Sequence, residues 1–132
     1  MQHSAKLANA LLLLRLSVFL VMLMWTLDKF INPDHSAAVY ANFYQLGGLG
    51  PQVFLMIGAL ELLLLLAFVT GFRKTISYAL VLGIHAVSTL STWQQYLDPF
   101  NNLLFFAAIP MLAACWTLFS LRELDTRLSL GG

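Results

Sequence analysis

One stretch near the beginning of the sequence decides the fold: residues 7–27 read LANALLLLRLSVFLVMLMWTL, in which Arg15 is the only charged side chain. About 20 apolar residues in a helix suffice to cross the hydrocarbon core of a bilayer. The stretch therefore predicts a membrane-spanning helix, which ends at the charged pair Asp28 and Lys29. A cleaved signal peptide is the alternative, since Lys6 precedes the stretch, but its length and the lack of a small-residue cleavage site favour a retained span.

Three further apolar stretches follow, and each contains at most one ionisable residue: residues 51–72, 76–93 and 103–121. With the first span at residues 7–27, they predict an all-α fold, a four-helix transmembrane bundle that forms a single domain over residues 1–132. The composition agrees, because 60% of the 132 residues are hydrophobic and only 10% are charged. A mean hydropathy of +0.81 leaves too little polar surface for a water-soluble domain of this size.

The connection between the first two spans contains its own helix signals. Asn32-Pro33-Asp34 is typical of a helix start and Gly47-Gly48 of a helix end, so the sequence predicts a short helix from about His35 to Leu46. Aromatic side chains with a polar tip prefer the headgroup region of a membrane. Three aromatic residues therefore favour an interfacial helix on the outer surface: Tyr40, Phe43 and Tyr44.

The basic residues outside the spans predict the orientation. One side of the membrane would carry five of them: Lys6, Arg73, Lys74, Arg122 and Arg127. The opposite side would carry only Lys29, so the positive-inside rule predicts that both termini and the second connection lie in the cytoplasm. The mixed charges after Leu121 predict a tail that lies in water or at the interface.

Three ionisable side chains fall inside the predicted spans: Arg15, Glu61 and His85. An isolated charge at the bilayer centre costs about 2.5 kcal/mol or more, so these side chains should face the bundle interior and find partners. An Arg15–Glu61 ion pair is the expected solution. Helical spacing and small size add six residues that would line a narrow polar pocket around them: Lys29, Gly58, Tyr78, Ser88, Thr89 and Thr92.

This polar centre has a structural and a functional interpretation. In the first, the Arg15–Glu61 pair fixes the register of the helices and His85 is a satisfied hydrogen-bonding partner. In the second, the three side chains bind the oxygens of a small redox molecule such as a quinone and carry its protons. The sequence offers no metal-ligand spacing, and its net charge of +1 gives no reason to expect nucleic acid as a partner. Cys115, the lone cysteine, is expected to be a packing residue.

The chain resembles the DoxX-like family of small four-helix membrane proteins. The similarity covers most of the chain and rests on short motifs in this order: Arg15-Leu16, Asp28-Lys29-Phe30, Asn32-Pro33, Gly58-Ala59-Leu60-Glu61, Gly71-Phe72-Arg73, His85 and Asn101-Asn102. The resemblance implies a four-helix bundle that accompanies redox or sulfur-oxidising systems, in some cases as a subunit associated with quinone reduction. The chain has no CxxC pair, so the thiol–disulfide chemistry of related quinone-linked bundles is not available to it alone.

Three hypotheses for the function follow. The leading one is a membrane subunit or quinone-contacting partner of a redox system, such as a subunit of a quinone-linked oxidoreductase, with Arg15, Glu61 and His85 as its polar centre. The alternative is a non-catalytic anchor or assembly subunit of a larger complex, and the third is a conduit for protons or a small solute. In each case the expected partners are the lipid bilayer and another protein or a second copy of the chain.

Overall fold

The structure is a computed structural model and describes residues 2–43, 47–48 and 50–130. Within these ranges it contains helices and turns and no strand, so this part of the chain is all-α as predicted. The α-helices are α1 (Gln2–Ile31), α2 (Pro33–Phe43), α3 (Pro51–Thr70), α4 (Lys74–Ser91), α5 (Trp93–Tyr96) and α6 (Ala108–Ser120). Three short 3-10 helices cover Pro99–Asn101, Leu103–Ala107 and Arg122–Leu124.

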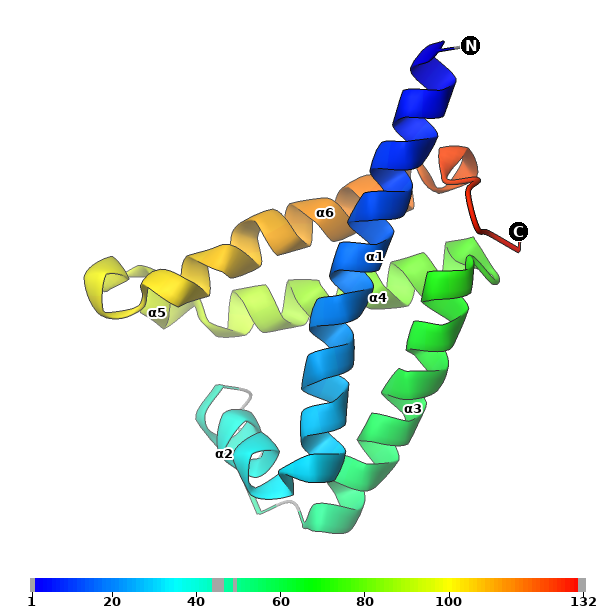
Figure 1. Cartoon of the computed structure of the whole chain (residues 1–132). Helices are drawn as coiled ribbons and strands as arrows, with labels where there is room; N and C mark the ends of the chain where they lie inside the picture. Colours follow the sequence, from blue (N-terminus) through cyan, green and yellow to red (C-terminus); the bar gives the residue numbers. More distant parts are fainter. Residues whose placement is uncertain (1, 44–46, 49, 131–132) are drawn as a thin grey trace.

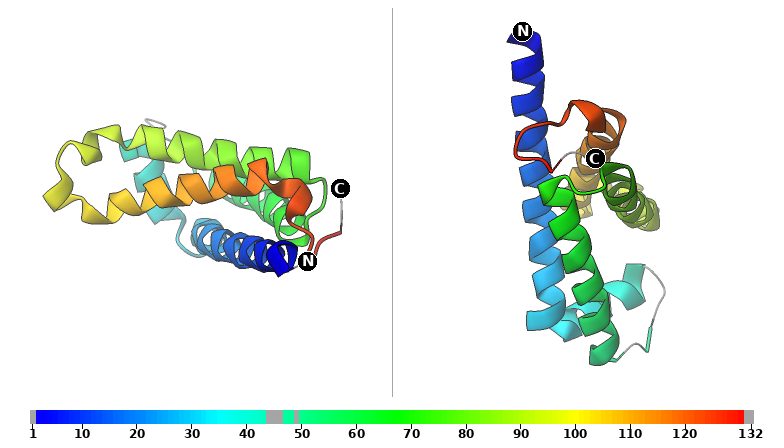
Figure 2. Two further views of the ribbon diagram at one scale, coloured as in Figure 1. Left: turned by 90° about the horizontal axis from the view of Figure 1, so that it is seen from above. Right: turned by 90° about the vertical axis from the view of Figure 1, so that its right-hand side faces the viewer.

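The long helices form two pairs. α1 packs along α3, and α4 packs along α6, so each pair resembles a hairpin in space (Figure 1). The second pair runs crosswise to the first, which the two turned views show from above and from the side (Figure 2). The structure therefore does not confirm the predicted four-helix transmembrane bundle.

Three segments are long and apolar enough to cross a membrane: Ser4–Ile31, Gln52–Thr70 and Leu103–Ser120. They correspond to the first, second and fourth predicted spans. α4 is not among them, because Lys74, His85 and several hydroxyl side chains lower its hydropathy. The span predicted at residues 76–93 thus stays a prediction.

The short helix between the first two spans is present as α2. It begins at Pro33, whose fixed φ and missing N–H suit the first helical position, and it packs on α1 and α3. Its predicted end at Leu46 and its predicted aromatic Tyr44 lie outside the described residues.

The turn between α3 and α4 is set by glycine. Gly71 has φ +72°, and its N–H donates to the carbonyl of Phe68 at 3.2 Å. The N–H of Phe72 donates to the carbonyl of Ala67 at 2.8 Å, which completes a Schellman motif. Arg73 is also left-handed, with φ +47°, so the chain reverses within three residues and α4 starts at Lys74.

Replacing Gly71 with alanine should lower the free energy of unfolding in detergent by about 1–2 kcal/mol. A side chain is strained at φ +72°, and the new Cβ would collide with the side chain of Ser129. Gly83→Ala is the matched control, because a Cβ at Gly83 meets nothing within 4 Å. Denaturation of both variants in the same detergent provides the measurement, and equal stability of the two would contradict this account of the turn.

An apolar core lies where the two pairs cross. It consists of Leu11, Val18, Met22, Leu65, Phe68, Tyr78, Val81, Cys115 and Leu118. Cys115 is 1% exposed, which confirms its prediction as a packing residue. The outward faces of the helices are also apolar, and Leu13, Leu63 and Leu90 are 68%, 65% and 70% exposed. Apolar surface on both sides of a helix is what a lipid environment permits.

The C-terminal tail folds back onto the helices, although most of residues 122–130 are exposed, and its predicted place in water or at the interface stays a prediction. After α6 the chain turns back across the end of the molecule where α3 gives way to α4, and the N–H of Leu130 donates to the carbonyl of Thr70 at 2.7 Å. Asp125 in this tail is fully buried. A carboxylate is buried only where cations and hydrogen-bond donors surround it, and here Arg15 and Tyr78 contact the Asp125 carboxylate.

Candidate functional site

A pocket of about 570 Å³ lies between the two helix pairs. One wall comes from α1, α2 and α3, and the other comes from α4, the 3-10 helix Leu103–Ala107 and the start of α6. The lining is mostly apolar, with a few polar groups on each wall. A mainly apolar cavity with a small number of convergent polar groups is the usual form of a small-molecule site.

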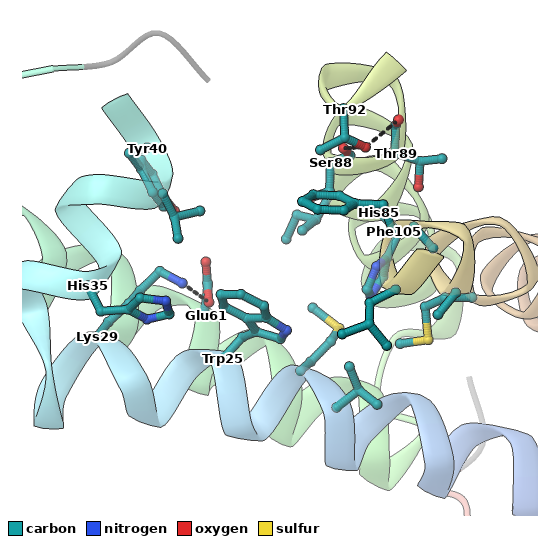
Figure 3. A pocket seen from close by; sticks show the side chains of 18 residues that line it. Trp25, Lys29, His35, Tyr40, Glu61, His85, Ser88, Thr89, Thr92 and Phe105 are labelled. Atoms are coloured by element: carbon teal, nitrogen blue, oxygen red, sulfur yellow. Dashed lines mark hydrogen bonds and ion pairs between the residues drawn. The ribbon is translucent and has the colours of Figure 1, made fainter. Parts of the chain in front are cut away.

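The wall formed by α1 and α3 carries an ion pair. Lys29 Nζ lies 3.3 Å from Glu61 Oε2, and the hydroxyl of Thr26 donates to the same oxygen at 3.0 Å. Thr26 and Lys29 are three residues apart and therefore share one face of α1. The side chains of Lys29 and Glu61 are only 7% and 17% exposed. The pair is thus largely shielded from solvent and faces the pocket (Figure 3).

Aromatic rings border this ion pair. The Lys29 ammonium lies 5.7 Å from the centroid of the Tyr40 ring, within the range of a cation–π contact. Trp25 stacks on His35 with ring centroids 5.9 Å apart. His35 Nδ1 in turn lies 2.6 Å from Asp28 Oδ2, so α2 is fastened to the end of α1 beside the pocket.

The opposite wall presents the polar face of α4. His85, Ser88, Thr89 and Thr92 line the pocket, as their helical spacing predicts. The hydroxyl of Thr92 donates to the carbonyl of Thr89 at 3.1 Å and lies 3.1 Å from the hydroxyl of Tyr96. His85 Nε2 is different: it is buried, and among the described residues it has no hydrogen-bond partner. His85 lies across the pocket from Lys29 and Glu61 (Figure 3).

Arg15 does not belong to this pocket, and the predicted Arg15–Glu61 pair is wrong. Arg15 Nη1 lies 2.8 Å from Asp125 Oδ1, and both side chains are 0% exposed. The guanidinium also donates through Nη2 to the carbonyls of Arg127 at 2.5 Å and Leu128 at 3.1 Å. The physical reason is that the tail folds back and brings the buried carboxylate of Asp125 and two backbone carbonyls to Arg15, so the arginine has no need of Glu61.

Two of the predicted lining residues serve elsewhere. Tyr78 lies two turns before His85 on α4, about 10 Å along the helix, and donates its hydroxyl to Asp125 Oδ2 at 2.5 Å. Gly58 lies against α1, where an added Cβ would come within 2.9 Å of the ring of Phe30. The other four predicted lining residues are part of the pocket: Lys29, Ser88, Thr89 and Thr92.

The polar residues therefore form two separate clusters. The pocket contains Lys29, Glu61 and His85, whereas Arg15, Tyr78, Lys74 and Asp125 form what we call the tail cluster. In the tail cluster the Lys74 ammonium donates to the backbone carbonyl of Asp125. Sequence reasoning missed Asp125, since nothing in the tail distinguishes it from Glu123. It also missed Trp25 and Tyr40 as pocket residues, although their types are common in ligand sites.

Chemically, the pocket has a charge pair on one wall and, on the other, the imidazole of His85, whose buried Nε2 has no hydrogen-bond partner among the described residues; apolar and aromatic side chains line the rest. In the part of the chain that the structure describes, no group of three or more His, Cys, Asp or Glu residues could hold a metal ion. The arrangement suits an uncharged organic molecule with hydrogen-bonding oxygens. Comparisons of the chain with models of protein families, with curated proteins and with solved structures found no match.

Proposed function

We propose that this chain is a DoxX-like protein of the bacterial inner membrane that acts as a membrane subunit or quinone-contacting partner of a redox system. The pocket between the two helix pairs is the quinone site in this proposal. Lys29, Glu61 and His85 supply its polar contacts. Arg15 is left out of the site, because Asp125 and the tail carbonyls already engage it.

The single observation that supports this function best is the distribution of polar groups around the pocket. A quinone has a flat apolar ring with two carbonyl oxygens, so it needs apolar walls and hydrogen-bond donors at a few points. Lys29 is a donor at one wall, and His85 Nε2 has a vacant hydrogen-bonding position at the other. Trp25 and Tyr40 provide aromatic surface for a ring between them.

The distribution of charge supports the proposed orientation with four spans. The beginning of α1, the turn between α3 and α4 and the tail after α6 lie at one end of the molecule (Figure 1). This end carries most of the basic residues, and the pocket with Lys29 lies toward the other. Positive charge favours the cytoplasmic side, so both termini would be cytoplasmic and the pocket would lie in the outer half of the membrane.

Two other functions fit less well. A proton conduit needs a continuous polar path, but Val18 on α1 and Val81 on α4 are buried between the tail cluster and the pocket. A non-catalytic anchor would explain the apolar outer faces, which could contact another protein or a second copy of the chain. It would give no role to the pocket, in which His85 lies opposite the Lys29–Glu61 pair and its buried Nε2 has no hydrogen-bond partner among the described residues.

The test is quinone binding by the purified protein. We expect quinone in the lipids that co-purify with the wild-type protein. We also expect Glu61→Gln and His85→Ala each to weaken the binding of a short-chain quinone about tenfold, because each substitution removes a hydrogen bond to the quinone or the charge that orients a donor. Equilibrium binding followed by tryptophan fluorescence provides the measurement, because Trp25 lines the pocket.

Thr117→Ala is the matched control, because the hydroxyl of Thr117 points away from the pocket and donates to the carbonyl of Ala113 in its own helix. It should bind quinone like the wild type. If no quinone co-purifies and both pocket variants bind the analogue as the wild type does, the proposal is refuted. Loss of a partner complex in these variants, with no effect on quinone binding, would favour the anchor.

A further inference from the structure

The two helix pairs are fastened together at one end. At this end the reversal at Gly71 and Arg73 joins α3 to α4. The tail reinforces the junction, because the Arg15–Asp125 ion pair ties it to α1, the Tyr78–Asp125 hydrogen bond ties it to α4, and the Leu130–Thr70 hydrogen bond ties it to α3. The apolar core fills the crossing beside it.

The far ends of the pairs enclose the pocket and diverge from the junction (Figures 1 and 3). Here the polar residues of α4 line the wall of the pocket opposite the Lys29–Glu61 pair. His85 Nε2 has no partner among the described residues. A buried polar atom without a partner is unfavourable by about 1–3 kcal/mol, so this wall would gain from a group that came to meet it.

The apolar segments also favour a more parallel arrangement. α1 and α3 are each long enough to cross a bilayer, and so is the segment Leu103–Ser120. Spanning helices tilt by about 20° on average and rarely beyond 40°. Two pairs that lie crosswise cannot both lie close to the average tilt, whereas pairs that closed on the pocket would all be nearer the membrane normal.

We propose that the ligand of this pocket bridges its two walls and closes it. A flat ring with two opposed oxygens accepts one hydrogen bond from Lys29 on α1, beside Glu61, and one from His85 on α4. Binding then draws the α4–α6 pair toward α1 and α3, with Gly71 to Arg73 as the hinge. This inference rests on the proposed function. It adds that the two opposed oxygens of the ligand are recognised and that their recognition moves the α4–α6 pair toward α1 and α3.

The bridging geometry explains why two oxygens are needed. A ligand shifts an equilibrium between two conformations only by the difference between its affinities for them. A ring with one polar end gains the same hydrogen bond in the open and the closed form. A ring with two opposed oxygens makes both contacts only when the walls approach each other, and therefore favours the closed form.

The experiment measures the distance between the two pairs by pulsed electron paramagnetic resonance in lipid nanodiscs. Spin labels are placed at Ile31→Cys at the end of α1 and at Phe100→Cys beyond α5, in a Cys115→Ala background. Ile31 and Phe100 are 79% and 87% exposed and do not line the pocket. The probes are duroquinone and durene, two flat six-membered rings with the same four methyl positions; duroquinone has two opposed carbonyl groups where durene, which is aromatic, has two C–H groups.

We expect duroquinone to shift the distance between the two labels to shorter values and durene to leave it unchanged. His85→Ala should abolish the shift. A control pair of labels at Leu13→Cys and Leu63→Cys, both within the α1–α3 pair, should show no change with either probe. Both control sites are exposed.

Duroquinone binding is measured in the same nanodiscs by tryptophan fluorescence, so that two failures can be distinguished. If duroquinone binds and the distance does not change, or if durene shortens the distance equally, the closure is refuted while the proposed quinone site stands. If duroquinone does not bind at all, the proposed function is refuted, and the bridging ligand with it.

Discussion

The Asp125→Asn substitution is expected to lower the free energy of unfolding in detergent by about 3–5 kcal/mol, because it leaves a buried cation without its counter-charge. Arg15 and Asp125 are both 0% exposed, with Nη1 and Oδ1 2.8 Å apart. Asparagine keeps the shape of the side chain and can still accept a hydrogen bond from Tyr78. The loss therefore reports the charge of Asp125. Titration of the folded protein with a denaturing detergent provides the measurement.

The matched variant replaces both partners with apolar residues of similar size, Arg15→Met together with Asp125→Leu. Removing a buried ion pair completely is often neutral or stabilising, so the double variant should recover most of the stability that Asp125→Asn loses. The opposite result would be that Asp125→Asn lowers the free energy of unfolding by less than about 1 kcal/mol while Glu61→Gln lowers it by several kcal/mol. That result would show that Glu61, and not Asp125, is the energetically important partner of Arg15.

The helices could be predicted from the sequence because apolar runs and their breaks are local signals. Residues 51–72 correspond to α3, which ends at Thr70, and residues 76–93 correspond to α4, which ends at Ser91. The first helix is longer than predicted, since Gln2 to Lys6 continue it before the apolar run begins. Hydropathy detects the membrane-spanning part of a helix and not its polar extension.

The crossing of the two pairs could not be predicted in the same way. α1 and α3 are apolar on all sides, so their sequences do not specify which face meets a neighbour. In a soluble bundle the apolar stripe of each helix would fix the arrangement. Here only polar residues distinguish one face from another, and His85, Ser88 and Thr89 of α4 and the following Thr92 lie on one wall of the pocket.

The partners of the ionisable residues were the hardest to predict. Glu61 is the only acid inside the predicted spans and is therefore the partner that the sequence suggests for Arg15, whereas the partner in the structure, Asp125, comes from a tail with no periodic pattern. Glu61 instead pairs with Lys29. The sequence predicts Lys29 as a residue that lines the pocket and does not predict this ion pair. Pairing depends on how the tail folds back, and this is a tertiary feature that spacing along one helix does not contain.

Exchanging the charges of the pocket pair is the second large effect that we expect. Lys29→Glu alone would place two carboxylates where Nζ and Oε2 now lie 3.3 Å apart, and should lower the free energy of unfolding by about 3 kcal/mol. Adding Glu61→Lys restores opposite charges and should return the stability to within about 1 kcal/mol of the wild type. Detergent denaturation of Lys29→Glu, of Glu61→Lys and of the double variant gives the interaction energy between the two positions directly.

Removing the Lys29–Glu61 pair tests whether it only fixes the register of the helices or also forms part of the ligand site. Lys29→Met with Glu61→Leu removes both charges and fills their volume, so the fold should retain its stability. If the pair only fixes the register of α1 and α3, this variant should also bind quinone like the wild type. If it forms one wall of the site, quinone affinity should fall about tenfold in a protein that remains folded, since one hydrogen bond to a charged group is lost. A stable variant with unchanged affinity would leave His85 without an opposite partner and remove the reason for the bridge.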